Sequence, residues 1–271
     1  MKTNIFLRSK FGKWSSVAVM AIFGMFCASA ANASVIKTDI VMIVDESGSM
    51  GSVQANLRNN IGLFASILSA GGVDASYALV GYGRSGDLIR LITDFTDASG
   101  FATAAANLVA TGSIEPAYDA TAFALNSLTS ETGSLSYRAD AVKNMILYTD
   151  EQSNGDSEFN VQSTDALLKA NNSLFNAVVS SQNYTDLVGL ATNNGGRFFD
   201  LGFLNTTDQS VVQTFVEDFA RAKLQETLDF CTSNPNDPAC ASVSVPSPAS
   251  LSLFLFALIV LGNKRLKVSK Q

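Results

Sequence analysis

The stretch of residues 39–50, with the sequence DIVMIVDESGSM, constrains the fold of this chain more than any other part of it. Its apolar run, rich in β-branched side chains, is typical of a strand buried on both faces of a parallel sheet. The polar residues that follow emerge at the carboxyl end of that strand, where open α/β sheets bind their ligands. The stretch therefore predicts an α/β fold with a binding site at one edge of the sheet.

Three oxygen-bearing side chains alternate directly after this strand: Asp45, Ser47 and Ser49. Carboxylate and hydroxyl oxygens are hard donors, the kind that Mg2+ and Ca2+ prefer. Gly48 allows the backbone to curl so that the alternating side chains converge. The pattern predicts a divalent metal site, although a polar turn that caps the next helix would use the same residue types.

The chain then alternates strands and helices, as a doubly wound sheet requires. Apolar patterns predict further strands over residues 75–82, 88–92, 143–149, 173–179 and 195–201, the first two of them joined as a hairpin. Helical spacing predicts helices over residues 52–70, 98–109, 116–128, 186–192 and 211–228. The predicted fold class is α/β, with a doubly wound, mostly parallel central sheet flanked by helices.

The spacing of Asp45, Ser47 and Ser49 resembles the first loop of the metal-ion-dependent adhesion site of von Willebrand factor A (VWA) domains. The resemblance covers residues 37–226 and implies a Rossmann-like doubly wound sheet with two further metal-binding loops. Residues 143–151 are similar to the family's third loop, an apolar run followed by Thr-Asp, which implies that Asp150 is the distal carboxylate.

The second loop of the family matches residues 112–120, where Ile114 stands near the position of a threonine in many relatives. Glu115 is the candidate ligand, because it resembles the glutamate that some A-domain branches, including the integrin β subunits, place here. Ser113 is the alternative. Glu115 would also suit the first turn of a helix, beside Pro116, without binding a metal.

Residues 1–33 have the composition of a secretory signal peptide. Four basic residues precede the apolar stretch 17–26, and small residues precede Ser34. We expect cleavage before Ser34 and export of the mature chain.

Residues 245–271 end the chain with an apolar segment followed by a basic tail. The segment 249–261 is short against the roughly twenty residues of a full membrane span. The order resembles the PEP-CTERM sorting signal of Gram-negative bacteria, with Ser247 in place of the glutamate of the Pro-Glu-Pro motif. The resemblance implies an exosortase-type processing enzyme and a transient inner-membrane anchor, followed by release to the cell surface or extracellular matrix. An ordinary anchor that stays uncut is the alternative.

Cysteine usage indicates an oxidising compartment. Cys27 lies in the signal peptide, whereas Cys231 and Cys240 remain and can close a small polar loop, so we expect a disulfide between them. The predicted organisation is a signal peptide over residues 1–33, a VWA-like domain over 34–228, a cysteine-bridged linker over 229–244 and a sorting signal over 245–271.

Composition argues against two broad functional classes. The net charge is −6 and the basic residues are concentrated in the two ends, so phosphate backbones would repel the mature domain and nucleic acid is not an expected partner. The chain contains no histidine, which removes the histidine-dependent triads and zinc hydrolases and disfavours an enzyme.

The sequence favours an exported cell-surface or biofilm-matrix binding module that uses Mg2+ or Ca2+ to capture an aspartate or glutamate of a protein partner. One alternative is an envelope assembly or structural protein in which the metal is only stabilising. A less favoured alternative is a metal-dependent hydrolase whose carboxylates gather at one sheet edge, drawn from Asp45, Glu46, Glu115 and Asp150.

Overall fold

The computed structural model of the protein describes residues 35–240. Within them a six-stranded sheet has the strand order β3-β2-β1-β4-β5-β6. All neighbouring strands are parallel except β2 and β3, which form the predicted antiparallel pair. The strands are β1 (Ile36–Asp45), β2 (Val73–Arg84), β3 (Asp87–Thr96), β4 (Val142–Thr149), β5 (Leu174–Val179) and β6 (Phe198–Asp200).

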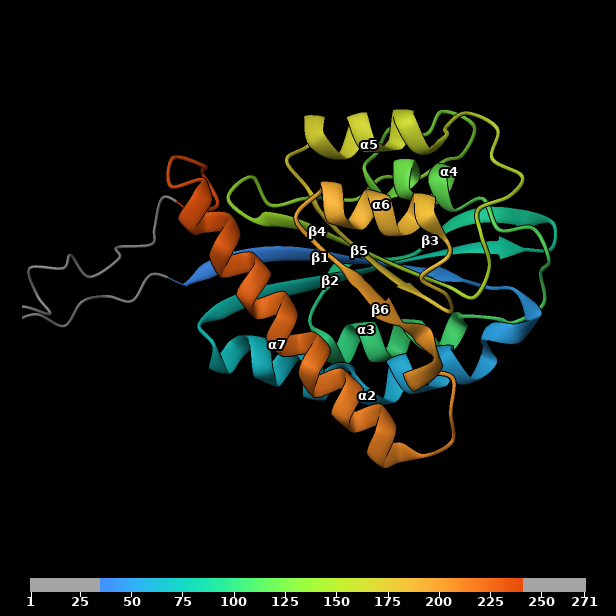
Figure 1. Ribbon diagram of the computed structural model, residues 1–271, viewed down its shortest axis with the longest axis horizontal. Helices are drawn as coiled ribbons and strands as arrows, with labels where there is room; N and C mark the ends of the chain where they lie inside the picture. Colours follow the sequence, from blue (N-terminus) through green and yellow to red (C-terminus); the bar gives the residue numbers. More distant parts are fainter. Residues whose placement is uncertain (1–34, 241–271) are drawn as a thin grey trace, which may run out of the picture. The chain divides into compact units, whose positions relative to one another are not determined.

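Helices cover both faces of this sheet, which confirms the predicted fold class. Figure 1 shows α4, α5 and α6 on one face and α2, α3 and α7 on the other. Their bounds are α2 (Gly51–Ala70), α3 (Ala98–Ala104), α4 (Ala117–Ala124), α5 (Val161–Ala170), α6 (Thr185–Asn193) and α7 (Gln209–Ser233). Three short 3-10 turns complete the described elements: η1 (Gly48–Met50), η2 (Ala105–Asn107) and η3 (Leu201–Phe203).

The apolar run of β1 is continuous because this strand contributes to two cores. Successive side chains of a strand point to opposite faces. Met42 and Val44 therefore pack in the core beneath α2 and α7, whereas Val41 and Ile43 pack in the core beneath α4, α5 and α6. β1 is central and pairs with β2 on one side and β4 on the other, so its polar groups can reach solvent only at its ends.

Several observed elements differ from the predicted ones. The helix α5 was not predicted, although Asn160 and Ser163 form a capping box at its start, and this pair is visible in the sequence. The helix α4 stops at Ala124 rather than at residue 128, because the chain turns at Asn126, whose φ is 57°. The strand β6 has three residues, and the rest of the predicted strand forms neighbouring turns and η3.

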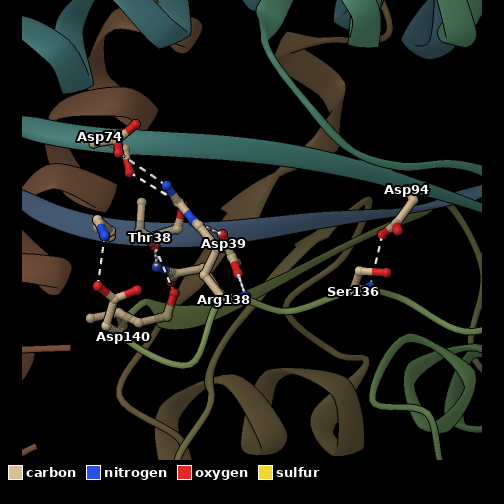
Figure 2. A network of polar contacts seen from close by, with 10 residues as sticks. Thr38, Asp39, Asp74, Asp94, Ser136, Arg138 and Asp140 are labelled. Carbon is tan, nitrogen blue, oxygen red and sulfur yellow. Dashed lines mark hydrogen bonds and ion pairs between the residues drawn. The ribbon is translucent and has the colours of Figure 1, made fainter. Parts of the chain in front are cut away.

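The long connection between α4 and β4 is fixed to the sheet by Arg138 (Figure 2). Its Nε donates to Oδ1 of Asp39 at 2.7 Å, and its backbone N–H donates to Oδ2 of the same carboxylate at 2.7 Å. The guanidinium also donates to the carboxylate of Asp74 and to the carbonyl of Thr38. Burial raises the pKa of Asp39, whereas the hydrogen bonds and the charge of Arg138 lower it. Arg138 thus compensates a carboxylate whose side chain is 0% exposed.

The C-terminal end of the described chain is closed by a disulfide between Cys231 and Cys240, as predicted. The helix α7 continues to Ser233, five residues beyond the predicted end, so that Cys231 lies on the helix itself. Both cysteines and Ala239 are buried against the core beneath α7. The bridged segment therefore belongs to the folded domain.

Within residues 35–240, no helix combines the length and the apolar composition needed to cross a bilayer. The signal peptide and the sorting signal expected from the sequence lie outside the described residues.

We predict that Arg138→Met lowers the free energy of unfolding by about 3 kcal/mol, because the variant leaves Asp39 buried without its cation. Chemical denaturation measures the change. Lys37→Met is the control, since it removes an exposed pair with Asp140 and should cost less than about 1 kcal/mol. Equal losses in the two variants would contradict the role assigned to Arg138.

We further predict that a Cys231→Ser, Cys240→Ser double variant stays folded and loses about 2–3 kcal/mol of stability, since the bridge closes a loop with a sequence separation of 9. Hydrogen exchange should rise at the end of α7 and in the segment that follows. An increase that spread over β1 and β4 would show that the bridge supports more of the domain than its position implies.

Candidate functional site

The first of three loops at the carboxyl end of the sheet joins β1 to α2. Asp45 is the last residue of β1 and is fully buried. Its Oδ1 accepts a hydrogen bond from the backbone N–H of Ser47 at 2.6 Å, and the hydroxyl oxygens of Ser47 and Ser49 lie 3.3 Å apart. The curl of this loop therefore brings the three alternating side chains together.

Asp45 is held by hydrogen-bond donors and not by a cation. Thr149, at the end of the adjacent strand β4, donates its hydroxyl to Oδ2 of Asp45 at 2.9 Å. Burial raises the pKa of Asp45 to about 6; the hydrogen bonds from Ser47 and Thr149 lower it, and the charge of Glu115 raises it. In residues 35–240, Asp45 is a member of no salt bridge.

The third loop follows Thr149 and begins with Asp150. The carbonyl of Asp150 accepts hydrogen bonds from the hydroxyls of Ser180 and Tyr184, each at 2.8 Å, which fixes its backbone. Its carboxylate oxygen Oδ1 is buried and has no hydrogen-bond partner among the described residues. Leaving a buried acceptor unpaired is costly, and the cost is larger for a charged group. This oxygen is therefore available for a ligand.

In the second loop Glu115 is buried, whereas Ser113 lies at the surface. Glu115 is 2% exposed, and its Oε2 accepts a hydrogen bond from the side-chain amide of Asn154 at 2.5 Å. Burial raises the pKa of Glu115; the bond from Asn154 lowers it, and the charges of Glu151 and Asp150 raise it. Ser113 is exposed. Glu115 thus adds negative charge to the site, whether or not it binds an ion directly.

The first two loops are joined by Glu46, whose carboxylate pairs with Arg90. The guanidinium of Arg90 donates to both carboxylate oxygens of Glu46, at 2.6 and 2.9 Å, and the N–H of Val109 donates to one of them. The backbone N–H groups of Thr111 and Gly112 donate to the carbonyl of Glu46. Glu46 therefore positions the loops and is not a candidate ligand.

Two aspartates join the second and third loops. Asp156 accepts hydrogen bonds from the N–H groups of Tyr118 and Asp119 at the start of α4. In return, Asp119 accepts from the N–H groups of Ser157 and Phe159 at 2.6 and 2.7 Å. The three loops are thus held in place by protein hydrogen bonds.

The donors at this edge suit a hard divalent cation. They are carboxylate and hydroxyl oxygens, which favour Mg2+ or Ca2+, and one carboxylate oxygen has no other partner. Within residues 35–240, no group of three or more histidine, cysteine, aspartate or glutamate side chains is arranged to hold a metal ion. Any ion held here would therefore depend on the hydroxyls of Ser47 and Ser49 as well as on carboxylates.

Sequence reasoning missed the residues that support the candidate donors. Thr149 bonds directly to Asp45, and its only signal was its place before Asp150 in the Thr-Asp pair. Asn154 bonds to Glu115 from a different loop, which no local pattern indicates. Glu46 was considered only as one carboxylate of a possible hydrolase, and its distant partner was not identifiable from the sequence.

Comparison with known proteins gives the family. Curated protein sequences gave no match. Two structures of proximal thread matrix protein 1 from the mussel byssus are similar, with 16% and 17% sequence identity and TM-scores of 0.47 and 0.50. The matches cover 68% and 70% of this chain, which spans about half of the mussel protein (47% and 49%). Because the sequence identity is this low, the likeness concerns the fold alone. The profile of the von Willebrand factor type A domain matches residues 39–217, and the chain therefore belongs to this family.

Proposed function

We propose that this protein is an exported binding module that holds one divalent metal ion between its first and third loops and captures a carboxylate of a partner protein. Asp45, Ser47, Ser49 and Asp150 would hold the ion, with Glu115 as the second-loop ligand or as a charge behind it. Ser113 remains the alternative in that loop. Mg2+ is the favoured ion, and Ca2+ would tolerate the same donors.

One observation supports this proposal above the others: the buried carboxylate of Asp45 and the buried Oδ1 atom of the half-buried Asp150 lack a cationic partner among the described residues. Asp45 forms no salt bridge within the described residues, and Oδ1 of Asp150 has no hydrogen-bond partner there. Buried charges in proteins are paired or coordinate metals. A divalent cation between the two loops would supply the missing positive charge.

The chemistry of capture follows from the charge of the site. A bound ion with one open coordination position would accept a carboxylate oxygen from the partner. Without a cation, Asp45, Glu115 and Asp150 would repel that carboxylate. Partner binding should therefore depend steeply on the metal. Ile114, which is 44% exposed beside these acids, offers an apolar contact at the rim.

The hydrogen bonds between the loops favour a role in partner binding over a metal that only stabilises the fold. Glu46 with Arg90, and Asp119 with Asp156, already tie the three loops together through protein hydrogen bonds. An ion would therefore add little stiffness to loops that are already positioned. This favours capture over the envelope assembly alternative, and a binding role over a hydrolase, because the chain contains no histidine to act as a general base.

Export is part of the proposal. The disulfide between Cys231 and Cys240 suits a compartment outside the cytoplasm. We infer that residues 1–33 direct secretion and that residues 245–271 act as a sorting signal that an exosortase-type enzyme removes, which would release the domain to the cell surface or matrix of a Gram-negative bacterium.

We predict that the purified protein binds one Mg2+ or Ca2+ and that a Ser47→Ala, Ser49→Ala double variant binds it at least about tenfold more weakly. The reason is that two oxygen donors are lost with little change in volume, and even groups that merely support metal ligands contribute tenfold or more to affinity. Titration calorimetry measures the affinity.

A Ser66→Ala, Ser69→Ala double variant is the matched control, because it removes two exposed hydroxyls at the far end of α2. Unchanged affinity in a folded Ser47→Ala, Ser49→Ala variant would refute the ligand assignment.

We also predict that a partner isolated from envelope extract in Mg2+ is released by EDTA and is not bound by Asp150→Asn. The substitution preserves shape but removes one charge from the site. Asp140→Asn, an exposed acid at the other end of the sheet, is the control. If the metal raised the melting temperature but left partner binding unchanged, the metal would be stabilising only, and the capture role would be wrong.

A further inference from the structure

A groove of about 670 Å³ lies between the edge strand β6 and the first half of α7, apart from the candidate metal site. Its floor and one wall consist of aromatic side chains from two elements and the turn between them. They are Phe198, Phe199, Phe203, Phe215 and Phe219. Binding pockets for compact ligands typically have volumes of about 300–1,000 Å³, so the groove has room for two or three side chains.

The aromatic rings are packed against one another and range from buried (Phe215 and Phe219) to exposed (Phe203). The centroids of Phe199 and Phe219 lie 4.6 Å apart in an edge-to-face arrangement, and Phe203 stacks on Phe215 at 6.3 Å. Phe203 is nevertheless 51% exposed. Among the large apolar side chains of residues 35–240 it shares this highest exposure with Val35. An exposed aromatic surface that is rigidly supported is typical of an interaction site.

The rim of the groove is acidic. Asp200, at the end of β6, and Asp218, on α7, are both exposed and line the groove, and neither forms a salt bridge within residues 35–240. No lysine or arginine is among the residues that line it. Carboxylates at the rim attract a cation, and phenylalanine faces stabilise one that lies over them. The groove is therefore complementary to a group that is both apolar and positively charged.

The backbone next to the groove indicates the form of the occupant. Within the described sheet β6 is an edge strand, paired with β5 on one side only. An exposed sheet edge can accept an extended peptide as an added strand, while neighbouring pockets select its side chains.

We propose that this groove binds an extended segment of a partner protein in which an arginine or lysine stands between apolar side chains. The apolar side chains lie on the phenylalanine floor, and the cation lies between Asp200 and Asp218. Arginine suits the site better than lysine, because its guanidinium carries several N–H donors in a planar fork that matches carboxylates. The proposal uses none of the candidate metal ligands.

The test uses the fluorescently labelled peptide acetyl-Gly-Leu-Arg-Phe-Gly-amide, titrated with the full-length protein in EDTA and followed by anisotropy. We expect saturable binding that weakens about tenfold when glutamate replaces the arginine of the peptide, because attraction to the rim becomes repulsion. Alanine in place of its leucine and phenylalanine should also weaken binding.

Two variants of the protein locate the binding. Phe203→Ser should lower the affinity about tenfold, and Asp218→Asn about threefold, since a partly exposed charge contact contributes modestly. Leu88→Ser, which alters an exposed apolar residue on β3, and Asp229→Asn, which removes an exposed charge from α7 outside the groove, are matched controls and should bind as the parent does. Circular dichroism confirms that each variant is folded.

Several outcomes would overturn this proposal. One is the absence of saturable binding, and another is binding that Phe203→Ser and Asp218→Asn leave unchanged. Binding that appears only after residues 241–271 are deleted would assign the groove to the chain's own C-terminal segment. Self-association abolished by Phe203→Ser, measured by sedimentation, would assign it to a second copy. Because the assay contains EDTA, it can succeed or fail independently of the metal-dependent capture proposed above.

Discussion

The buried strand β1 carries an aspartate on each side of its apolar run, and the structure depends on how these two charges are compensated. Burying a carboxylate costs several kcal/mol unless a partner offsets the lost hydration. Asp39 receives that partner from the chain, because Arg138 donates to it from a connection about a hundred residues away. Asp45 accepts hydrogen bonds from the backbone N–H of Ser47 and the hydroxyl of Thr149. It pairs with no lysine or arginine within the described residues. The fold thus satisfies one end of the strand and leaves the other end suited to an external cation.

The difference between the two ends follows from the topology. The carboxyl ends of β1 and β4 are adjacent, so the loops after them must meet, and the second loop is drawn in through Glu46 and Asp119. The loops are therefore positioned by Glu46 and Asp119, which are not candidate ligands. The loop after β5 contacts Asp150 through Ser180 and borders the aromatic groove at Gln182. This one loop therefore borders both the third loop and the groove.

Local patterns in the sequence predicted the central elements well, because β1, β4 and β5 are buried on both faces and read as continuous apolar runs. The alternation at Asp45, Ser47 and Ser49 was also visible, since a turn acts on neighbours in sequence. The sequence could not show that Arg138 reaches Asp39 or that Asn154 reaches Glu115, because these contacts depend on tertiary packing. The helix α5 was missed for another reason: its apolar face is narrow, and its clearest signal was the cap at Asn160.

The disulfide at the end of α7 has a mechanical consequence. Tension applied through the chain beyond Cys240 passes across the sulfur bridge to Cys231, and the residues between them carry no load. Cys231 lies in the last turn of α7 with its side chain buried against the core, so the load enters the folded domain through a buried side chain and bypasses residues 232–239. With the bridge intact, opening the domain from this side would require α7 to separate from the sheet. For a protein proposed to hold a partner outside the cell, this attachment makes the domain resistant to being pulled open from its C-terminal side.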